Sequence, residues 1–167
     1  PVQIYATDID ADALNVARSG TYPANIAADV TPERLKRFFV KEGAAYRIKK
    51  EIRETVVLAP QDFIKDPPFS RMDLICCRNL LIYLESEMQK KVVPLLHYAL
   101  KPGGLLLLGT SESVGEATDL FNVVDKKWKL YQRREAVVGP ERLRFPASFA
   151  PSLREPIIEQ VARLNEN

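Results

Sequence analysis

Residues with polar or aromatic side chains follow three apolar segments of the sequence, at the points where predicted strands end. These residues are, in chain order, Asp8, the pair Asp62-Phe63 and the pair Arg78-Asn79. In open α/β sheets, ligands bind beyond the carboxyl ends of the strands. We therefore take these residues as the first candidates for a binding site.

The first two candidates carry groups that recognise a nucleoside. A carboxylate at Asp8 can accept hydrogen bonds from two ribose hydroxyls, as acidic residues do in dinucleotide-binding folds. Asp62 can accept a hydrogen bond from an exocyclic amine such as that of adenine, while Phe63 packs beside the ring. The alternatives are that Asp8 and Asp10 only cap the next helix, and that Asp62-Phe63 is a polar turn with a core aromatic.

The third candidate carries groups that can hold a carboxylate. Arg78 offers a fork of N–H donors that suits a carboxylate, and Asn79 offers both a donor and an acceptor. Tyr83 follows closely enough to bring its phenol to the same strand end. The alternative is that Arg78 pairs with a nearby Glu and that Tyr83 is buried in the core.

Other reactive residue types are assigned less specific roles. Cys76 and Cys77 are interpreted as packing residues of a strand, and His97 as a structural residue of a helix. The segment Ser111-Glu112-Ser113 either lines the same cleft or is a solvated loop. One histidine and two adjacent thiols speak against a structural zinc site, so no metal is predicted.

The elements that position these residues are predicted from periodicity and capping signals. Strands are predicted at 2–7, 54–59, 72–76 and 105–108, helices at 11–18, from Pro32 and at 86–100, and small antiparallel strands within 40–53. Lys101–Gly104 is predicted to be a turn, and residues 121–124 and 128–132 a closing strand pair. This alternation predicts an α/β sheet, mostly parallel, with an antiparallel edge.

Composition excludes several classes of protein. The chain has 167 residues, of which 46% are hydrophobic, so a sizeable core can be buried. A net charge of +2 gives no electrostatic case for a nucleic-acid partner, and no apolar run is long enough to insert in a membrane. Two adjacent cysteines fit the reducing cytosol, so we expect a cytoplasmic location. No glycine fingerprint is present, which disfavours a nicotinamide-dependent dehydrogenase.

Four stretches of the chain together resemble one known family. They are A-T-D-I-D at 6–10, A-R-S-G-T-Y at 17–22, D-L-I-C-C-R-N-L-L-I-Y at 73–83 and L-K-P-G-G at 100–104. In this order and spacing they resemble CheR-type chemotaxis protein-glutamate O-methyltransferases, which use S-adenosylmethionine. The resemblance covers residues 2–133, and C-R-N-x-x-I-Y is its specific part.

The resemblance implies a class I, Rossmann-like methyltransferase sheet and a role for each candidate. Asp8 would hold the ribose of the cofactor, and Asp62 with Phe63 would lie near the adenine, where the family has Asn-Leu. Arg78 and Asn79 would border the cofactor, and Arg78 with Tyr83 would orient the acceptor glutamate. The implied reaction is attack by an already ionised carboxylate on the activated methyl group, with S-adenosylhomocysteine as the product.

The resemblance also implies a domain organisation. Family members begin with a helical domain and a strand that ends in the glycine-containing cofactor loop, whereas this chain resembles them only from the second strand onward. We therefore expect a partial methyltransferase domain at 1–134 that lacks the first strand, with a small β-subdomain at 40–53 that helps to contact receptors. A proline-rich linker at 135–152 and a short amphipathic helix at 153–167 would lead to a further domain of a fused, multidomain sensor.

The missing strand would lie between the strands that end at Asp8 and Cys77. We expect these two strands to pair directly, or their exposed edges to pair with another copy. The chain alone is expected to show weak or no methyl transfer. The predicted function is methylation of glutamate side chains of chemoreceptor-like signalling proteins, and the alternative is a non-catalytic regulatory module with a degenerate methyltransferase fold.

Overall fold

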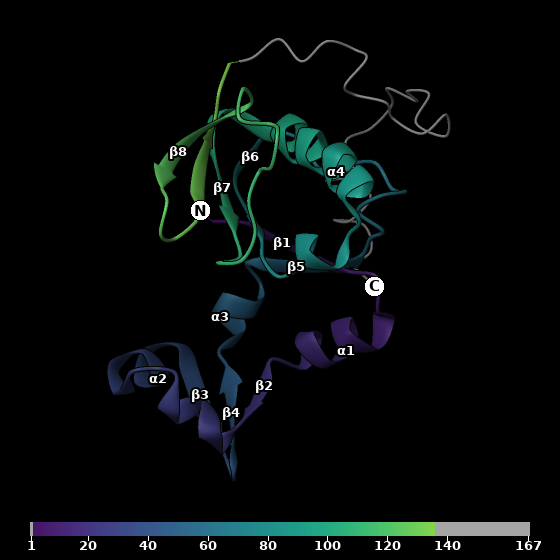
Figure 1. The fold of residues 1–167 in the computed structure, drawn as a ribbon. Helices are drawn as coiled ribbons and strands as arrows, with labels where there is room; N and C mark the ends of the chain where they lie inside the picture. Colours follow the sequence, from purple (N-terminus) through teal and green to yellow (C-terminus); the bar gives the residue numbers. More distant parts are fainter. Residues whose placement is uncertain (1, 136–167) are drawn as a thin grey trace. The chain divides into compact units, whose positions relative to one another are not determined.

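The computed structural model describes residues 2–135, so the predicted linker and terminal helix lie outside the described residues, apart from Glu135. The described chain divides between Asp62 and Phe63 into two compact units. Unit 1, which precedes the division, contains two small sheets, and unit 2, which follows it, contains one four-stranded sheet (Figure 1).

A parallel strand pair forms one part of unit 1. Its elements are β1 (Ile4–Asp8), α1 (Ala11–Ser19) and β5 (Val56–Pro60). The register places Asp8 of β1 opposite Pro60 of β5, so both strands end at the same edge. Both strands were predicted, and their parallel pairing agrees with an α/β fold.

Helix α1 has the boundaries that its end residues predict. The Asp10 carboxylate accepts hydrogen bonds from the backbone N–H groups of Asp12 and Ala13, which otherwise lack partners in the helix. Gly20 ends the helix with a φ of 61°, a left-handed conformation that glycine adopts without strain. The Cβ of any other residue at position 20 would also lie 2.7 Å from the Arg53 side chain.

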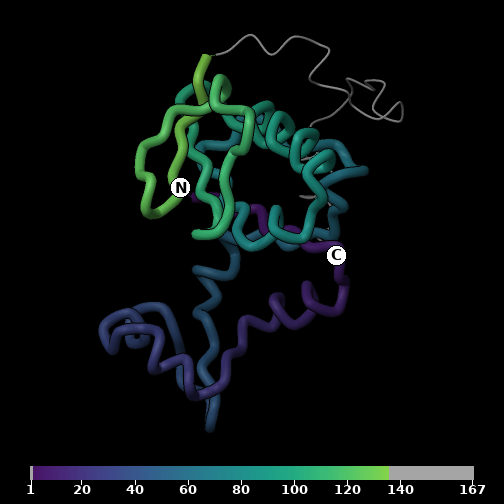
Figure 2. The backbone as a smooth tube through the Cα atoms, in the orientation of Figure 1, coloured from purple at the N-terminus to yellow at the C-terminus, as the bar shows by residue number. Residues whose placement is uncertain are grey.

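A small antiparallel sheet forms the other part of unit 1. Its elements are β2 (Thr21–Pro23), η1 (Ala24–Ala28), α2 (Pro32–Phe38), β3 (Phe39–Glu42), β4 (Ala45–Ile48) and α3 (Lys50–Arg53). The central strand β4 pairs with both β2 and β3, and Figure 2 follows this path. Edge-to-face contacts between the rings of Tyr22, Phe39 and Tyr46 stabilise the sheet. The hairpin was predicted, whereas β2 and α3 were not.

Unit 2 is built on a four-stranded sheet with the order β6-β7-β9-β8. Its elements are β6 (Met72–Cys77), η2 (Leu81–Tyr83), α4 (Ser86–Ala99), β7 (Leu100–Leu108), β8 (Phe121–Asp125) and β9 (Leu130–Arg133). β6 and β7 are parallel, while β9 and β8 add the predicted antiparallel edge. Helix α4 lies across the sheet (Figure 1), and its Val92 and Leu96 pack with Leu106 in the core.

Two expectations about the strands are wrong. Lys101–Gly104 is not a separate turn, because β7 begins at Leu100 and these residues bulge from it, with Gly103 at a φ of 74°. The strands that end at Asp8 and Cys77 do not pair directly, because within the described chain β1 pairs with β5 and β6 pairs with β7. Pairing of their edges with another copy stays a prediction.

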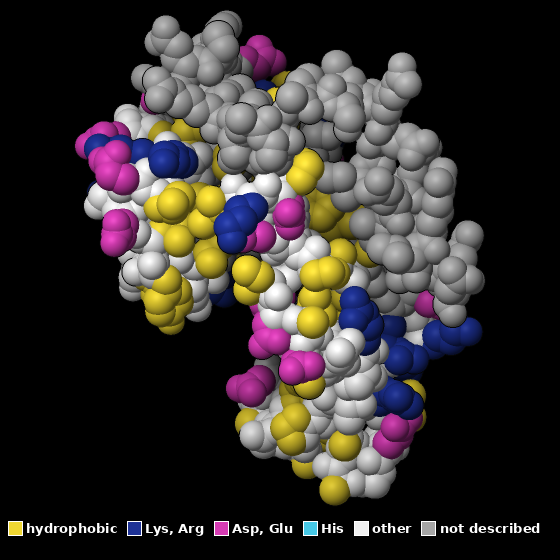
Figure 3. Space-filling view, turned by 90° about the vertical axis from the view of Figure 1, so that its right-hand side faces the viewer, with side chains coloured by type: hydrophobic (Ala, Val, Ile, Leu, Met, Phe, Trp, Pro, Cys, Tyr) yellow, Lys and Arg dark blue, Asp and Glu magenta, His cyan; other side chains and the backbone are white. Residues whose placement is uncertain are grey.

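The surface carries charges of both signs. On the face drawn in Figure 3, Lys and Arg side chains occur alongside Asp and Glu side chains, in keeping with the net charge of +2. Among the described helices, none combines the length and the apolar character needed to cross a membrane.

His97 on α4 is part of the unit 2 core, as the sequence analysis expected. The side chain is 1% exposed, its Nε2 atom lies 3.0 Å from the carbonyl oxygen of Arg134, and its ring packs edge-to-face on Phe121. Burial lowers the pKa of His97, because the charged imidazolium loses its hydration. The folded state therefore holds the neutral ring.

We predict that this buried histidine makes the folded chain less stable as the pH decreases. Because its pKa is lower in the folded state, protons bind first to the unfolded state, and the stability present above about pH 6.5 is lost as the pH falls through the folded pKa. The slope of the unfolding free energy should reach at most about 1.4 kcal/mol per pH unit. Urea unfolding between pH 7 and pH 5.5, roughly the titration range of histidine, measures it.

His97→Gln is the matched control, because the chain contains only one histidine. The variant should lose the slope in this pH range. An equal slope in the variant and in the wild type would show that another group titrates there.

Candidate functional site

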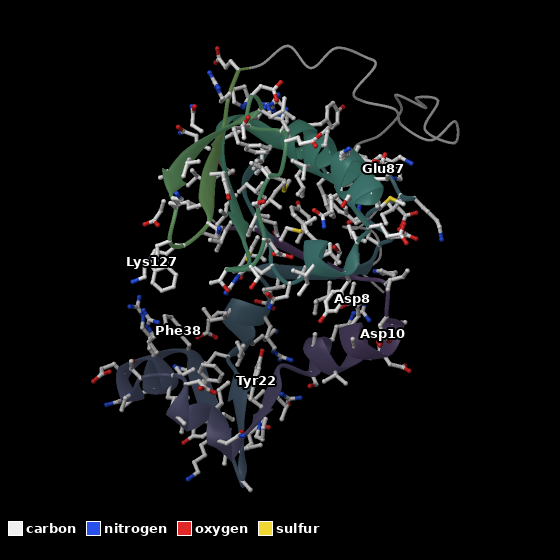
Figure 4. All side chains as sticks on the ribbon, in the orientation of Figure 1. Asp8, Asp10, Tyr22, Phe38, Glu87 and Lys127 are labelled. Carbon is white, nitrogen blue, oxygen red and sulfur yellow. The ribbon has the colours of Figure 1, made fainter. Side chains whose placement is uncertain are left out.

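Asp8 lies at the carboxyl end of β1, beside the start of α1 (Figure 4). One oxygen of its exposed carboxylate accepts the backbone N–H of Asp10 at 3.0 Å, which fixes the turn between strand and helix. The helix cap itself is Asp10. Asp10 thus caps the helix, whereas Asp8 fixes the turn before it and keeps its second carboxylate oxygen free of hydrogen bonds to described residues.

The segment after β5 meets Asp8 at the same edge of the parallel pair. The backbone N–H of Gln61 donates to the carbonyl oxygen of Asp8 at 2.9 Å, and Asp62 comes next in the chain with a half-buried side chain. The structure therefore brings Asp8 and the Gln61-Asp62 segment together. Phe63 packs against the core of unit 2, as the alternative of a core aromatic expected.

After β6 the chain leaves the core of unit 2. Arg78 and Asn79 follow the buried Cys77 directly, and both side chains are exposed. Tyr83 ends η2 with 78% of its surface exposed, so it is not a core residue. Within the described residues of unit 2, no acidic side chain pairs with the guanidinium of Arg78. The alternative of a buried Tyr83 is therefore wrong, and the alternative of an Arg78–Glu pair is not observed within the described residues of this unit.

The backbone of this loop is held by the carboxylate of Glu112, which is 4% exposed. Five backbone N–H groups donate to it. Oε1 accepts from Leu80 at 2.8 Å, Leu81 at 2.7 Å and Ile82 at 3.4 Å. Oε2 accepts from Asn79 at 3.0 Å and Gly109 at 2.6 Å. One side chain thus ties the loop after β6 to the end of the neighbouring strand β7.

The close approach of these segments requires a glycine. A Cβ at position 109 would lie 2.6 Å from Oε2 of Glu112 and 2.8 Å from Oδ1 of Asn79, which is nearer than real Cβ atoms approach other atoms. Asn79 has a φ of 58°, and asparagine tolerates this left-handed region better than most residues. Both residue types therefore follow from the local backbone geometry.

The carboxylate and the thiol in this region have opposite pKa shifts. Burial alone would raise the pKa of Glu112, but hydrogen bonds from Gly109, Asn79 and the following loop amides outweigh burial and hold the pKa below its usual range. Burial raises the pKa of Cys77 to about 11. Glu112 is thus ionised at neutral pH, while Cys77 is a protonated packing residue; Cys76, by contrast, is exposed.

Glu112 is the residue whose role the sequence analysis missed. The segment Ser111-Glu112-Ser113 was expected either to line a cleft or to be a solvated loop, and only the two serines are exposed. The donors to Glu112 are backbone groups, so no side-chain pattern indicates them. The one available signal is Gly109, a strand-end glycine three residues before an acid.

A groove with a volume of about 510 Å³ lies elsewhere on unit 2, between α4 and residues 113–120. None of the predicted site residues lines it. Among the described residues, no group of three or more His, Cys, Asp or Glu side chains is placed to hold a metal ion.

Comparison with known proteins identifies the family. Residues 1–130 match the model described as "CheR methyltransferase, SAM binding domain". The chain is 39% identical over 127 residues to the chemotaxis protein methyltransferase of Vibrio parahaemolyticus, which covers 74% of this chain and 46% of that protein. It is 34% identical over 131 residues to the Escherichia coli chemotaxis protein methyltransferase, covering 72% of the chain and 44% of the relative.

A further relative is much longer than this chain. A protein described as an uncharacterized 104.1 kDa protein in the hypE 3' region of Rhodobacter capsulatus is 40% identical over 139 residues. The match covers 83% of this chain and 15% of that protein. A solved structure, PKMT2 from Rickettsia typhi, is 17% identical with a TM-score of 0.39 over 64% of this chain and 16% of that one, too low a score to bear on the fold.

The chain thus spans less than half the length of the chemotaxis methyltransferases that it matches. The family model covers most of the described residues, including the ends of β1, β5 and β6. The chain belongs to the CheR methyltransferase family as a SAM-binding domain, and S-adenosylmethionine is the cofactor expected of it.

Proposed function

We propose that this chain takes part in the transfer of a methyl group from S-adenosylmethionine to glutamate side chains of chemoreceptor-like signalling proteins. The observation that carries the proposal is the exposed Arg78, which has no acidic partner among the described residues of unit 2 and follows β6 on a loop whose backbone Glu112 holds in place. The family match and the chemotaxis methyltransferases among the relatives support it.

The donor set at the end of β1 fits the nucleoside part of the cofactor. Asp8 presents a carboxylate that is fixed on one oxygen by the Asp10 N–H and uncommitted on the other within the described residues. Such a carboxylate accepts hydrogen bonds from ribose hydroxyls. Asp62, whose segment is hydrogen-bonded to Asp8, is the proposed acceptor for the adenine amine.

The residues after β6 fit an acceptor carboxylate. The guanidinium of Arg78 presents parallel N–H donors to two carboxylate oxygens, and the phenol of Tyr83 adds a further donor. Asn79 is proposed to border both the cofactor and the incoming side chain. Bidentate binding would fix the direction of the acceptor oxygen, which is the main requirement of a displacement reaction.

The proposed methyl transfer requires little from the protein beyond alignment of the reactants. When bound, S-adenosylmethionine supplies an electrophilic methyl group. A glutamate side chain is already ionised at neutral pH, so no general base is needed to activate it. We propose that Arg78 and Tyr83 contribute by alignment and by excluding water from the acceptor oxygen, not by proton transfer.

The partners and the location follow from the same proposal. Methyl-accepting chemoreceptors are the proposed partners, and the cytoplasm, where their methylation sites would be reached, is the proposed location. Fusion to further domains is also proposed, and the much longer Rhodobacter capsulatus relative supports it. Residues 40–53, which include most of β3 and all of β4, are the proposed receptor-contacting subdomain.

We predict that Asp8→Asn weakens binding of S-adenosylhomocysteine to the full-length natural protein. Loss of a charge-assisted hydrogen bond costs about 1.5–3 kcal/mol, so affinity should fall roughly 10- to 100-fold in isothermal calorimetry. Asp12→Asn removes the same charge from the first turn of α1 and should bind like wild type. Equal affinities for wild type and Asp8→Asn would contradict the assignment of Asp8.

We predict that Arg78→Lys impairs methyl transfer through the acceptor. The lysine keeps the charge but loses the bidentate fork, so kcat/KM for the acceptor protein should fall roughly tenfold or more. Incorporation of labelled methyl groups into receptor glutamates measures it. Arg71→Lys, at an exposed position just before β6, is the matched control.

The alternative of a non-catalytic module makes a different prediction. If the full-length protein neither binds S-adenosylhomocysteine nor methylates a receptor, the fold serves only to connect signalling domains. Binding of S-adenosylhomocysteine without any methyl transfer would support a regulatory module that senses the cofactor.

A further inference from the structure

Glu112 is a buried anion whose partners are all backbone amides of the candidate site. Its two oxygens accept five N–H groups, four of them from the consecutive residues 79–82. The fifth comes from Gly109, at the end of β7. No cation neutralises the charge among the described residues, so these amide dipoles stabilise it.

We infer that Glu112 is a positioning residue for methyl transfer, which acts by fixing the backbone between Arg78 and Tyr83; this inference rests on the proposed function. The held amides begin immediately after Arg78 and end immediately before Tyr83. The two residues proposed to grip the acceptor therefore lie at the two ends of one clamped segment. The segment between them cannot shift without breaking hydrogen bonds to Glu112.

A carboxylate is the group that this arrangement requires. It accepts hydrogen bonds on both oxygens and donates none, which suits five converging donors. A glutamine has the same shape, but its NH₂ group would face N–H donors in place of one oxygen. At Oε2 the two opposed donors would be Asn79 and Gly109, and at Oε1 the loop amides. Glu112→Gln therefore tests charge and acceptor number with little change of volume.

The neighbouring acid Glu116 provides the matched control. It lies four residues further along the same segment, its side chain is 83% exposed, and its Oε2 forms a surface ion pair with Nζ of Lys90 at 3.7 Å. Glu116→Gln removes the same charge without touching the loop after β6. Surface ion pairs contribute little to stability, so this variant should behave like wild type.

The test compares turnover with cofactor affinity in the full-length natural protein. For Glu112→Gln, kcat should fall roughly 10- to 100-fold because small displacements of aligned groups are costly, while the Kd for S-adenosylhomocysteine should change less than about fivefold. Hydrogen exchange at the amides of residues 79–82 should become faster. Glu116→Gln should change none of these quantities.

Two further variants separate positioning from loss of folding. Leu106→Ala removes a fully buried core side chain and should lower the melting temperature while leaving kcat unchanged well below it. Gly109→Ala leaves Glu112 in the sequence but pushes on Oε2 and Asn79, so it should lower kcat as Glu112→Gln does.

Each outcome decides the inference. Unchanged kcat in Glu112→Gln, with an active wild type, overturns it and leaves the proposed function intact. A loss of activity that only follows the loss of folded protein, as in Leu106→Ala, also overturns it. A wild type that neither binds S-adenosylhomocysteine nor transfers methyl groups overturns the proposed function and this inference together. If Glu112→Gln does not fold, Gly109→Ala with normal kcat overturns it as well.

Discussion

One buried carboxylate, that of Glu112, holds together the chain segments that follow β6 and β7, and the first of these segments carries candidate site residues. Cys77 and Leu108 are paired residues at the carboxyl ends of two adjacent parallel strands, and the strand pairing ends with them. Beyond them, Glu112 accepts hydrogen bonds from both segments. Burying a carboxylate costs several kcal/mol unless it is well hydrogen-bonded. The five donors offset that cost and make the ionised form the stable one.

This interaction gives physical meaning to the stretch that carries the family resemblance. In C-R-N-x-x-I-Y, Cys77 closes the core, and Arg78 and Asn79 turn outward at the strand end. Leu81 returns to the core with 2% exposure, and Tyr83 faces outward again. The positive φ of Asn79 produces the change of direction, and Gly109 leaves room for it. The pattern is therefore a backbone geometry as much as a set of reactive groups.

Local rules predicted much of the fold from the sequence. The start of α1 at Asp10 and its end at Gly20 follow from capping, and the parallel and antiparallel parts of the sheet follow from periodicity and connection length. The bulge at Lys101–Gly104 was missed because a Pro-Gly-Gly run indicates a turn whether or not a strand continues through it. The direct pairing expected for β1 and β6 was wrong because strand partners are set by tertiary contacts, which local patterns do not contain.

The candidate site was predictable to a different extent. Strand-end positions indicated Asp8 and Arg78, and Tyr83 was added because it follows Arg78 closely. All three are exposed, which agrees with a role outside the core. The role of Glu112 could not be predicted from the sequence, because its partners are backbone amides, which almost every residue carries. Conversely, Phe63 has the residue type for stacking on a base, yet it packs on the core of unit 2.

The central proposal is that the end of β1, at Asp8, binds the nucleoside part of S-adenosylmethionine. Hydrogen exchange of the full-length natural protein, with and without S-adenosylhomocysteine, tests it most directly. The account predicts slower exchange in the segment around Asp8 when the ligand is bound. Unchanged exchange in this segment would contradict it.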